Sequence, residues 1–377
     1  MLAIGAIMRI LYVAPNIRIP GTNGGATHVT EVTAALRRHG EVLVLARRGS
    51  SGPQVVPLGL GNPPVLQHVL PFAYLPAVVL RARAFRPDVI YERFSAFGLG
   101  ALLKLACGVP LVTMVLEYQL SPLSLHLADR LVTTRPALLP ERVQSRVVHV
   151  HWGANPERFR PDADGAAVRA KLGLGGAPVV GYTGAFYPWH GLRTLVDAAR
   201  RLERRDVRFL LVGDGQVRGE VEALARAAGL GDRFVFPGRV PYDEIAAYVA
   251  ACDVCVAAYE PALHEATARS GDLALDPLKI FEYLAAERAV VACDSRNLRD
   301  LFDEREHLRL VPPGDAVALA GVLSELLAKA DEARAMARRG RERVLERYTW
   351  QRHADHLVRV FQECIEERGQ ASAPRSR

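Results

Sequence analysis

The chain has 377 residues, of which 50% are hydrophobic and 24% charged, as is typical of a soluble globular protein with about two domains. The formal net charge of +7 favours an anionic substrate or surface, but no RNA-binding signature, zinc-finger spacing or dense Lys/Arg run supports a nucleic-acid partner. No apolar run reaches the ~20 residues of a membrane span, and the N-terminal apolar run lacks the preceding basic residue of a signal peptide. The five cysteines indicate no disulfide framework, so we expect a reducing, cytoplasmic location.

The first half of the chain alternates expected strands with expected helices. Strands are predicted over 10–14, 41–46, 88–91, 109–116, 130–133 and 147–151, and helices over 29–39, 72–85 and 97–107. A polar, glycine-bearing loop over 21–28 follows the first strand, and residues 50–64 are also interpreted as a loop because Gly, Pro and Ser dominate there. This alternation predicts an α/β fold with a doubly wound parallel sheet.

A shift to Pro, Asp and Gly over 155–164 marks a candidate linker, and a second alternating series follows it. Strands are predicted over 179–183, 207–212, 234–236, 254–258, 289–292 and 307–310, and helices over 192–202, 217–228, 242–251, 316–348 and 351–366. Cys252 and Cys255 have the spacing of a redox or metal pair, but they lie beside or in a buried strand and no second pair joins them. We therefore expect both thiols to be small buried hydrophobes.

The stretch from Asp276 to Glu282 predicts a helix with two charged residues near its start. Asp276 is a suitable N-cap, and Pro277 is a suitable first helical residue. Lys279 and Glu282 are three residues apart, so they share one face of the helix. A cation and a carboxylate at a helix start suit a ligand with phosphate groups and ribose hydroxyls. An ordinary solvated Lys–Glu pair is the alternative interpretation.

In order along the chain, these pieces resemble the GT-B-fold retaining glycosyltransferases of the large family 4 type, also called glycosyltransferase group 1. The matching segments are the strand 9–13, Gly24-Gly25, 148–153, 157–161, 181–184, 189–191, 212–215, 236–238 and 251–253. The segment 276–283 is similar to a Pro-Leu-Lys-x-Phe-Glu-Tyr block that marks one subgroup.

The resemblance implies two Rossmann-like domains that face each other across a cleft. Residues 1–158, with a C-terminal helix in 350–377 packing back, would form the acceptor side, and residues 159–349 would bind the nucleotide sugar. The implied reaction moves a sugar from a nucleotide-diphosphate sugar to a hydroxyl acceptor, which is a glycan, a lipid-linked or a natural-product acceptor. Neither a metal nor a further cofactor is expected. A peripheral contact with the inner membrane face stays open, and the sequence does not indicate the nucleotide, the acceptor or the oligomeric state.

The same comparison gives expected roles to individual residues. The expected catalytic residues are Lys279 and His190, which would contact the leaving diphosphate, and Glu117, near the transferred sugar. Glu282 would accept hydrogen bonds from the ribose. The other expected donor-binding residues are Gly24, Gly25, Gly184, Gly213, Arg239, Val240, Asp276, Pro277 and Leu278. The competing interpretations are a plain turn at Gly24-Gly25, a surface histidine at 190, a structural Glu117 and, for Glu92-Arg93, either a solvated pair or an acceptor contact.

Two departures from the family pattern leave other functions open. Ala274 stands where many members have a glutamate eight residues before Glu282, and Ala185 and His190 occupy a loop where many have Arg and Lys. A catalytically weak homologue that acts as a partner or binding subunit is one alternative, and a GT-B sugar-nucleotide epimerase is another. A nicotinamide-dependent enzyme is disfavoured, because the first strand-to-helix turn lacks Gly-x-Gly-x-x-Gly.

Overall fold

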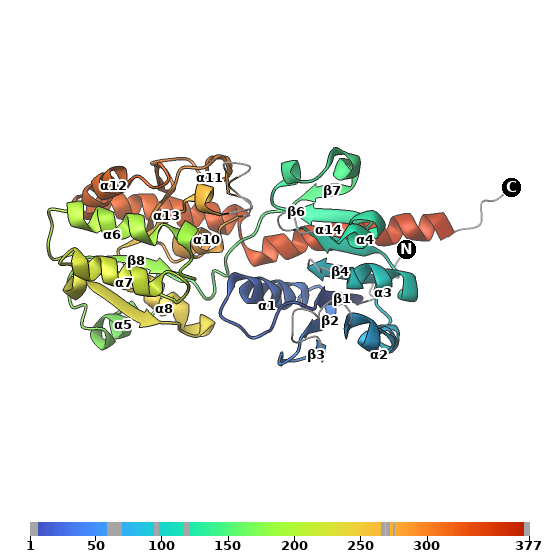
Figure 1. Cartoon of the computed structure of the whole chain (residues 1–377). Coiled ribbons are helices and arrows are strands. Elements are labelled where there is room, and N and C mark those ends of the chain that lie inside the picture. The colour runs from blue at the N-terminus through green and yellow to red at the C-terminus, as the bar shows by residue number, and fades with distance from the viewer. Residues whose placement is uncertain are drawn as a thin grey trace. The chain divides into compact units, whose positions relative to one another are not determined.

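The computed structural model describes residues 7–58, 70–93, 98–115, 121–264, 268, 272–273 and 276–372, which form two compact units. Unit 1 comprises Met1–His151 and Trp350–Arg377, and unit 2 comprises Trp152–Thr349. The chain thus leaves unit 1 before the expected boundary at residue 158. It returns with helix α14 (Trp350–Ser372), which packs against α1 (Gly24–Leu36) of unit 1 (Figure 1).

Unit 1 is built on a seven-stranded parallel sheet whose order is β3-β2-β1-β4-β5-β6-β7. Its strands are β1 (Met8–Ala14), β2 (Gly40–Arg47), β3 (Val55–Leu58), β4 (Val89–Arg93), β5 (Leu111–Met114), β6 (Arg130–Thr133) and β7 (Val147–His149). The remaining helices of the unit are α2 (Leu70–Phe85), α3 (Leu99–Cys107) and α4 (Pro122–Leu127). Because the order reverses between β1 and β4, the carboxyl ends of these two strands form the topological switch point of unit 1.

Unit 2 repeats this arrangement with six parallel strands in the order β10-β9-β8-β11-β12-β13. The strands are β8 (Val179–Thr183), β9 (Arg208–Val212), β10 (Phe234–Gly238), β11 (Val254–Ala257), β12 (Ala289–Cys293) and β13 (Arg309–Val311). The helices are α5 (Gly165–Lys171), α6 (Leu192–Arg201), α7 (Arg218–Ala227), α8 (Ile245–Ala250), α10 (Leu278–Ala285), α11 (Arg296–Leu301), α12 (Ala316–Ala328) and α13 (Ala330–Arg347). The switch point here lies between β8 and β11, and the predicted α/β class with doubly wound parallel sheets is confirmed.

Each unit has its own hydrophobic core. The parallel strands are buried on both faces of their sheet, and their residues are therefore nearly all apolar. Leu11, Ile90 and Leu111 lie in the core of unit 1, and Phe209 and Val256 in the core of unit 2. Among the described helices, none is both long and apolar enough to cross a membrane.

Several predicted boundaries are wrong for local reasons. Gly24 and Gly25 do not lie in a loop but in the first turn of α1, because the Asn23 side chain caps this helix by accepting from Ala26 N. The expected loop over 50–64 contains β3, whose Pro57 is tolerated at the edge of a sheet. The single helix expected over 316–348 is two helices, which meet at Lys329. Cys252 and Cys255 are buried free thiols, as predicted.

Helix α10 packs closely against α13 because Gly340 has no side chain. A Cβ at this position would lie 2.6 Å from Leu284 Cδ2 and 2.7 Å from the His307 carbonyl oxygen. We expect Gly340→Ala to lower the melting temperature, because overpacking costs ~1–3 kcal/mol and exceeds the ~1 kcal/mol that alanine gains over glycine in a helix.

Gly321→Ala in α12 is the matched control, since a Cβ there would meet nothing within 4 Å. It should raise the melting temperature measured by circular dichroism. An equal rise for both variants would contradict the close approach of α13 to α10.

Candidate functional site

Helix α10 carries the two charged residues that the sequence singled out, and both are buried. Lys279 is 8% exposed and Glu282 is 7% exposed. The interpretation as a solvated surface pair is therefore wrong. The hydroxyl of Tyr283, on the same helix, accepts from Thr183 N at 2.7 Å and thereby fixes α10 to the carboxyl end of β8.

The start of α10 differs from the prediction. Pro277 is the N-cap and Leu278 the first helical residue, and Asp276 does not cap the helix. Instead, the buried Asp276 carboxylate accepts a hydrogen bond from Trp152 N at 3.1 Å. Asp276 therefore anchors the beginning of unit 2 to the segment before α10.

The ammonium group of Lys279 lies among aromatic rings. Its Nζ donates to Tyr182 Oη at 2.9 Å, and it lies 4.0 Å from the centroid of the Tyr182 ring and 5.0 Å from that of Tyr259. Burial lowers the pKa of Lys279 from 10.5 to about 7, although the negative charge of Glu282 acts in the opposite direction. The ring faces compensate part of the lost hydration through cation–π attraction.

The position of this group follows from the strand order. Tyr182 belongs to β8, and Tyr259 follows the end of β11. These two strands flank the topological switch point of unit 2, where open α/β sheets bind their ligands. The sequence brought Lys279 to attention, but it did not single out Tyr182 or Tyr259. The one signal for them was that both are aromatic residues at the ends of expected strands.

His190 joins the same group as an uncharged ring. Its Nδ1 lies 2.7 Å from Tyr182 Oη and also contacts the Ala185 carbonyl oxygen. Burial, followed by the positive charge of Lys279, lowers the pKa of His190 from 6.5 to about 2. His190 therefore supplies a hydrogen-bonding imidazole and no second cation. We call Tyr182, His190, Tyr259 and Lys279 the Lys279 cluster.

Gly184 and Gly213 lie beside the cluster because larger residues would not fit. Gly184 has a φ of +137°, and a Cβ on it would lie 3.0 Å from Lys279 Nζ. Gly213 has a φ of +138°, and a Cβ on it would lie 1.8 Å from the Gly184 carbonyl oxygen. The N–H groups of Gly184 and Gly213 already donate to Val212 O and Gly238 O, both at 2.9 Å. These glycines thus shape the site without offering their own N–H donors.

Glu282 and the turn after β10 form the rest of the expected donor site. Tyr242 Oη donates to Glu282 Oε1 at 3.3 Å. Arg239 has a largely exposed side chain that lies 3.8 Å from Asp214, in the turn after β9. Val240 follows it and is half-buried. Glu117 and Ala274 lie outside the described residues, so the expectations for them stay predictions.

Unit 1 contains the two remaining expected residues, Gly24 and Gly25, at the amino end of α1. In the neighbouring strand, Glu92 is not part of a solvated pair. It is fully buried and accepts hydrogen bonds from Gly100 N at 2.7 Å and Ser124 Oγ at 2.7 Å. Glu92 therefore holds α3 and α4 against the sheet.

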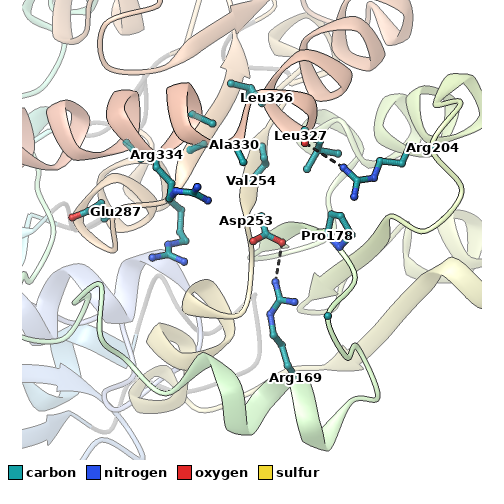
Figure 2. A pocket seen from close by; sticks show the side chains of 15 residues that line it. Arg169, Pro178, Arg204, Asp253, Val254, Glu287, Leu326, Leu327, Ala330 and Arg334 are labelled. Carbon is teal, nitrogen blue, oxygen red and sulfur yellow. Dashed lines mark hydrogen bonds and ion pairs between the residues drawn. The ribbon is translucent and has the colours of Figure 1, made fainter.

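A cavity of about 310 Å³ lies at the opposite end of the unit 2 sheet, where its strands begin (Figure 2). Its lining includes Pro178, Val254 and Ala289, which lie at or just before the first residues of β8, β11 and β12. Arg169 and Asp253 form an ion pair of 2.8 Å there. None of the expected site residues lines this cavity, and it lies at the amino ends of the strands. The Lys279 cluster, at the carboxyl ends, is therefore the better candidate site.

Comparison with known proteins supports this choice of unit. Residues 177–329, which lie in unit 2, match the family model described as glycosyl transferases group 1. The 2-deoxystreptamine glucosyltransferase of Streptomyces kanamyceticus is 34% identical over 197 residues, which are 50% of this chain and 48% of that protein. A GDP-mannose-dependent alpha-mannosyltransferase of Mycobacterium tuberculosis is 29% identical over 350 residues, 82% of this chain and 85% of that protein. The chain spans about half the length of several of the curated relatives that it matches.

Solved structures extend the likeness to both units. Sucrose-phosphate synthase from Thermosynechococcus elongatus has a TM-score of 0.77 at 22% identity, over 96% of this chain and 100% of that one. HepE of Anabaena, in complex with UDP and glucose, has a TM-score of 0.76 at 18% identity, over 94% of this chain and 99% of that one. These structures show the fold of the whole chain, and the family model covers the unit that holds the Lys279 cluster. Residues 177–329 are therefore similar to the group 1 glycosyl transferases, and the two Rossmann-like units of the chain have the GT-B fold.

Proposed function

We propose that the chain transfers a sugar from a nucleotide-diphosphate sugar to a hydroxyl acceptor, with retention of the anomeric configuration. The observation that carries this proposal is the buried ammonium group of Lys279 at the switch point of unit 2. A buried cation is costly unless an anion offsets it. Glu282 is three residues away on the same helix and also accepts from Tyr242, so a second anion would still be favoured beside Lys279.

The relatives agree on the class of donor but not on its identity. Matching proteins are named as glucosyl- and mannosyltransferases, and one of the latter is GDP-mannose-dependent. The HepE structure contains UDP and glucose. We therefore propose a nucleotide-diphosphate hexose as the donor and leave the nucleotide to experiment.

Lys279 would act on the leaving group. When the bond between the anomeric carbon and the diphosphate oxygen breaks, negative charge develops on the diphosphate. A fixed cation in a site of low polarity stabilises this charge far more than it would in water. The rings of Tyr182 and Tyr259 would keep water away from Lys279 Nζ.

His190 and Glu282 would orient the donor. The Ala185 carbonyl oxygen, to which Tyr182 Oη also donates, can only accept from His190 Nδ1, so the neutral imidazole carries its proton on Nδ1 and would offer Nε2 as an acceptor to a hydroxyl of the donor. Glu282 would accept hydrogen bonds from the ribose hydroxyls, as the acidic residue of a dinucleotide-binding fold does. The backbone around Gly213, Arg239 and Val240 would lie near the base.

Retention would follow from attack on the face from which the diphosphate leaves. The acceptor oxygen forms the new bond to the anomeric carbon, and its proton passes to the departing phosphate oxygen. No carboxylate nucleophile is needed for this route, so Glu117 would act near the sugar without forming a covalent bond.

The buried free thiols support a cytoplasmic location. Contact with an anionic membrane face would serve a lipid-linked acceptor.

The first test is donor binding and the effect of removing the Lys279 charge. One of UDP-, GDP- or dTDP-hexoses should raise the melting temperature of the wild-type protein. Lys279→Met should bind this donor more weakly and lower the rate of its transfer or hydrolysis by about 10²–10³-fold, the usual effect of losing one preorganised charge-stabilising group. Its fold should persist, because methionine removes a buried charge without leaving a cavity.

Each alternative function predicts a different result in the same assays. Stabilisation by none of the donors would contradict the donor site. Unchanged turnover in Lys279→Met would favour a weak homologue whose activity does not depend on this site. Conversion of the donor alone to its epimer, with no hydrolysis or transfer, would favour the epimerase.

The lowered pKa of Lys279 predicts how donor affinity depends on pH. Bound diphosphate favours the charged ammonium, so binding takes up a proton wherever the free protein has lost it. Because the pKa in the free protein is about 7, affinity for the nucleotide sugar should fall above pH 7, by up to about tenfold per pH unit. Calorimetric titrations from pH 6 to 9 would measure this, with Lys279→Met as the pH-independent control.

The stability of the donor-free protein should change with pH in the direction opposite to donor affinity. Between the folded pKa of about 7 and the unfolded value of 10.5, the unfolded chain binds more protons at Lys279. The contribution of Lys279 to the free energy of unfolding therefore rises with pH across this window. A wild-type donor affinity that stays flat from pH 7 to 9 would contradict a titrating ammonium at the phosphate.

Glu282 should make binding sensitive to the ribose. The wild-type protein should bind a ribonucleoside diphosphate about tenfold or more tightly than its 2′-deoxy analogue, because a hydrogen bond to a charged group contributes ~1.5–3 kcal/mol. Glu282→Ala should weaken binding of the ribonucleoside diphosphate and abolish the preference for it over the 2′-deoxy analogue. Tyr242→Phe, which removes the hydroxyl that donates to Glu282, is the control and should keep it. A preference that survives in Glu282→Ala would place the ribose elsewhere.

A further inference from the structure

The loop that follows β8 carries two aromatic rings outside the hydrophobic core of unit 2. The rings of Tyr187 and Trp189 are stacked, with their centroids 4.6 Å apart and their planes within 9° of parallel. Tyr187 is 37% exposed and Trp189 is half-buried, whereas their neighbour Phe186 lies fully buried in the core. Packing of the core therefore does not explain why two large rings are stacked at this place.

The geometry of the pair leaves one face of Tyr187 open. Trp189 covers the other face, and the ring of His190 is inclined by 74° to Tyr187 at 5.6 Å. His190 also lies 5.7 Å from Trp189. A ring that is equally far from both members of a stack lies beside their edges, since a ring over the outer face of Tyr187 would be much farther from Trp189. Within the described part of the chain, no further ring contacts Tyr187.

Backbone hydrogen bonds hold this pair in one position. Residues Pro188–His190 form a single 3-10 turn, in which His190 N donates to the Tyr187 carbonyl oxygen at 3.0 Å. Glu260 N, in the segment after β11, donates to the Trp189 carbonyl oxygen at 2.9 Å. A ring that is already fixed loses little conformational entropy when a ligand binds, so rigid aromatic side chains are effective anchors in binding sites.

The pair extends the Lys279 cluster toward one side of the switch point. His190 belongs to the cluster and also lies at the edge of the pair. Trp189 lies on the β11 side, because its carbonyl oxygen and its ring contact Glu260 and His264, which both follow β11. The turns after β9 and β10, where the base would lie, are on the opposite side of β8 in the order β10-β9-β8-β11. With the diphosphate at Lys279, the pair is therefore at the sugar end of the donor.

A six-membered sugar ring has the shape and polarity that suit an open aromatic face. In its chair form, a hexose carries most of its hydroxyls around the rim, while C–H groups lie on its two faces. These C–H groups are apolar and slightly positive, whereas the face of an aromatic ring is apolar and negative. Stacking would remove both apolar faces from water and leave the hydroxyls free to form hydrogen bonds.

We propose that the outer face of Tyr187, backed by Trp189, binds the apolar face of a polyhydroxylated six-membered ring. The proposal rests on the proposed function and names the part of that site which recognises a sugar. The ring is either the hexose of the donor or a ring of the acceptor. Tyr187 is thus a specificity-determining residue that contacts the sugar and not the phosphates.

Tryptophan fluorescence can report on this site directly. The chain has three tryptophans, and the other two, Trp152 and Trp350, are only 4% and 3% exposed. A ring bound over the pair should therefore change mainly the emission of Trp189. The probes are UDP-, GDP- and dTDP-hexoses, the matching nucleoside diphosphates, methyl glucoside and methyl mannoside. Trp189→Phe should abolish the change in emission while keeping a ring behind Tyr187.

Removal of the flat face of Tyr187 is the decisive change. Tyr187→Leu keeps an apolar side chain and should weaken binding of the ring, measured by calorimetry, about two- to tenfold, as expected for one aromatic stacking contact. Tyr187→Phe keeps the face and should bind like wild type. Tyr74→Ala is the matched control, because it removes a similarly exposed tyrosine (43%) from α2 of unit 1 and should change nothing. Trp189→Leu removes the backing ring, should weaken the same ligands, and keeps the test decisive if Tyr187→Leu does not fold.

Two arms of the experiment identify the source of the ring. The ring belongs to the donor if Tyr187→Leu weakens the nucleotide hexose but not the matching nucleoside diphosphate, and raises the KM for hydrolysis of the donor. It belongs to the acceptor if the variant binds and hydrolyses the nucleotide hexose like wild type, but loses the response to the methyl hexosides at saturating nucleoside diphosphate.

The proposal is overturned if binding of the nucleotide hexose and of the methyl hexosides is the same with and without the Tyr187 ring. It is equally overturned if Tyr187→Leu weakens the nucleoside diphosphate as much as the nucleotide hexose, because the pair would then stack on the base. In both cases, nucleotide binding that is weakened in Lys279→Met would still support the transfer proposal. Absence of all nucleotide binding would contradict transfer, whereas a Tyr187-dependent response to the methyl hexosides would still support the ring site, so the two proposals fail separately.

Discussion

The contact between the Lys279 ammonium and Tyr182 is the interaction on which the candidate site depends. The ammonium is removed from water, and what replaces water is one phenol oxygen at 2.9 Å and the faces of two aromatic rings. This replacement explains the neighbouring residues. Position 184 favours glycine because its φ is +137° and a Cβ would lie 3.0 Å from Lys279 Nζ. His190 is neutral because its own burial and then the same ammonium disfavour a second positive charge. Lys279 is thus left as the principal cation of the cluster, and its lowered pKa measures how incompletely the protein compensates its charge.

Sequence reasoning predicted the order of strands and helices well because hydrophobic patterning is local. Strand β8 has the predicted bounds, and the helix and strand expected after residue 276 are α10 and β12. The errors arise where a side chain acts over a long distance in the sequence. Asp276 has the residue type and place of an N-cap, but its carboxylate accepts from Trp152 N, 124 residues earlier. Local pattern cannot separate these two uses of an aspartate, because capping preference is only one of the bonds that such a carboxylate can make.

The candidate site was predictable to the extent that it lies on one helix. The spacing of Lys279 and Glu282 placed them on one face of the helix. It did not predict that this polar face is buried, as the seven successive residues 279–285 of α10 all are. Tyr182 and Tyr259 come from β8 and from the segment after β11, strands that are adjacent only in the folded sheet. His190 could be named from its loop, but its neutral state depends first on its burial and then on an ammonium group 89 positions later in the chain. Charge state is a property of the assembled environment and not of a motif.

The two units share a strand order, and each has a buried cation at its switch point. The two cations reach that point by different routes: Lys279 from a helix that follows β11, and Arg93 from the end of a strand. The common feature is therefore the chemical environment and not the sequence around it. At both points the carboxyl ends of two parallel strands diverge, backbone turns away from the sheet, and a helix begins beside them. Such a place can hold a buried positive charge only if the protein accepts a loss of stability or a ligand supplies the missing negative charge.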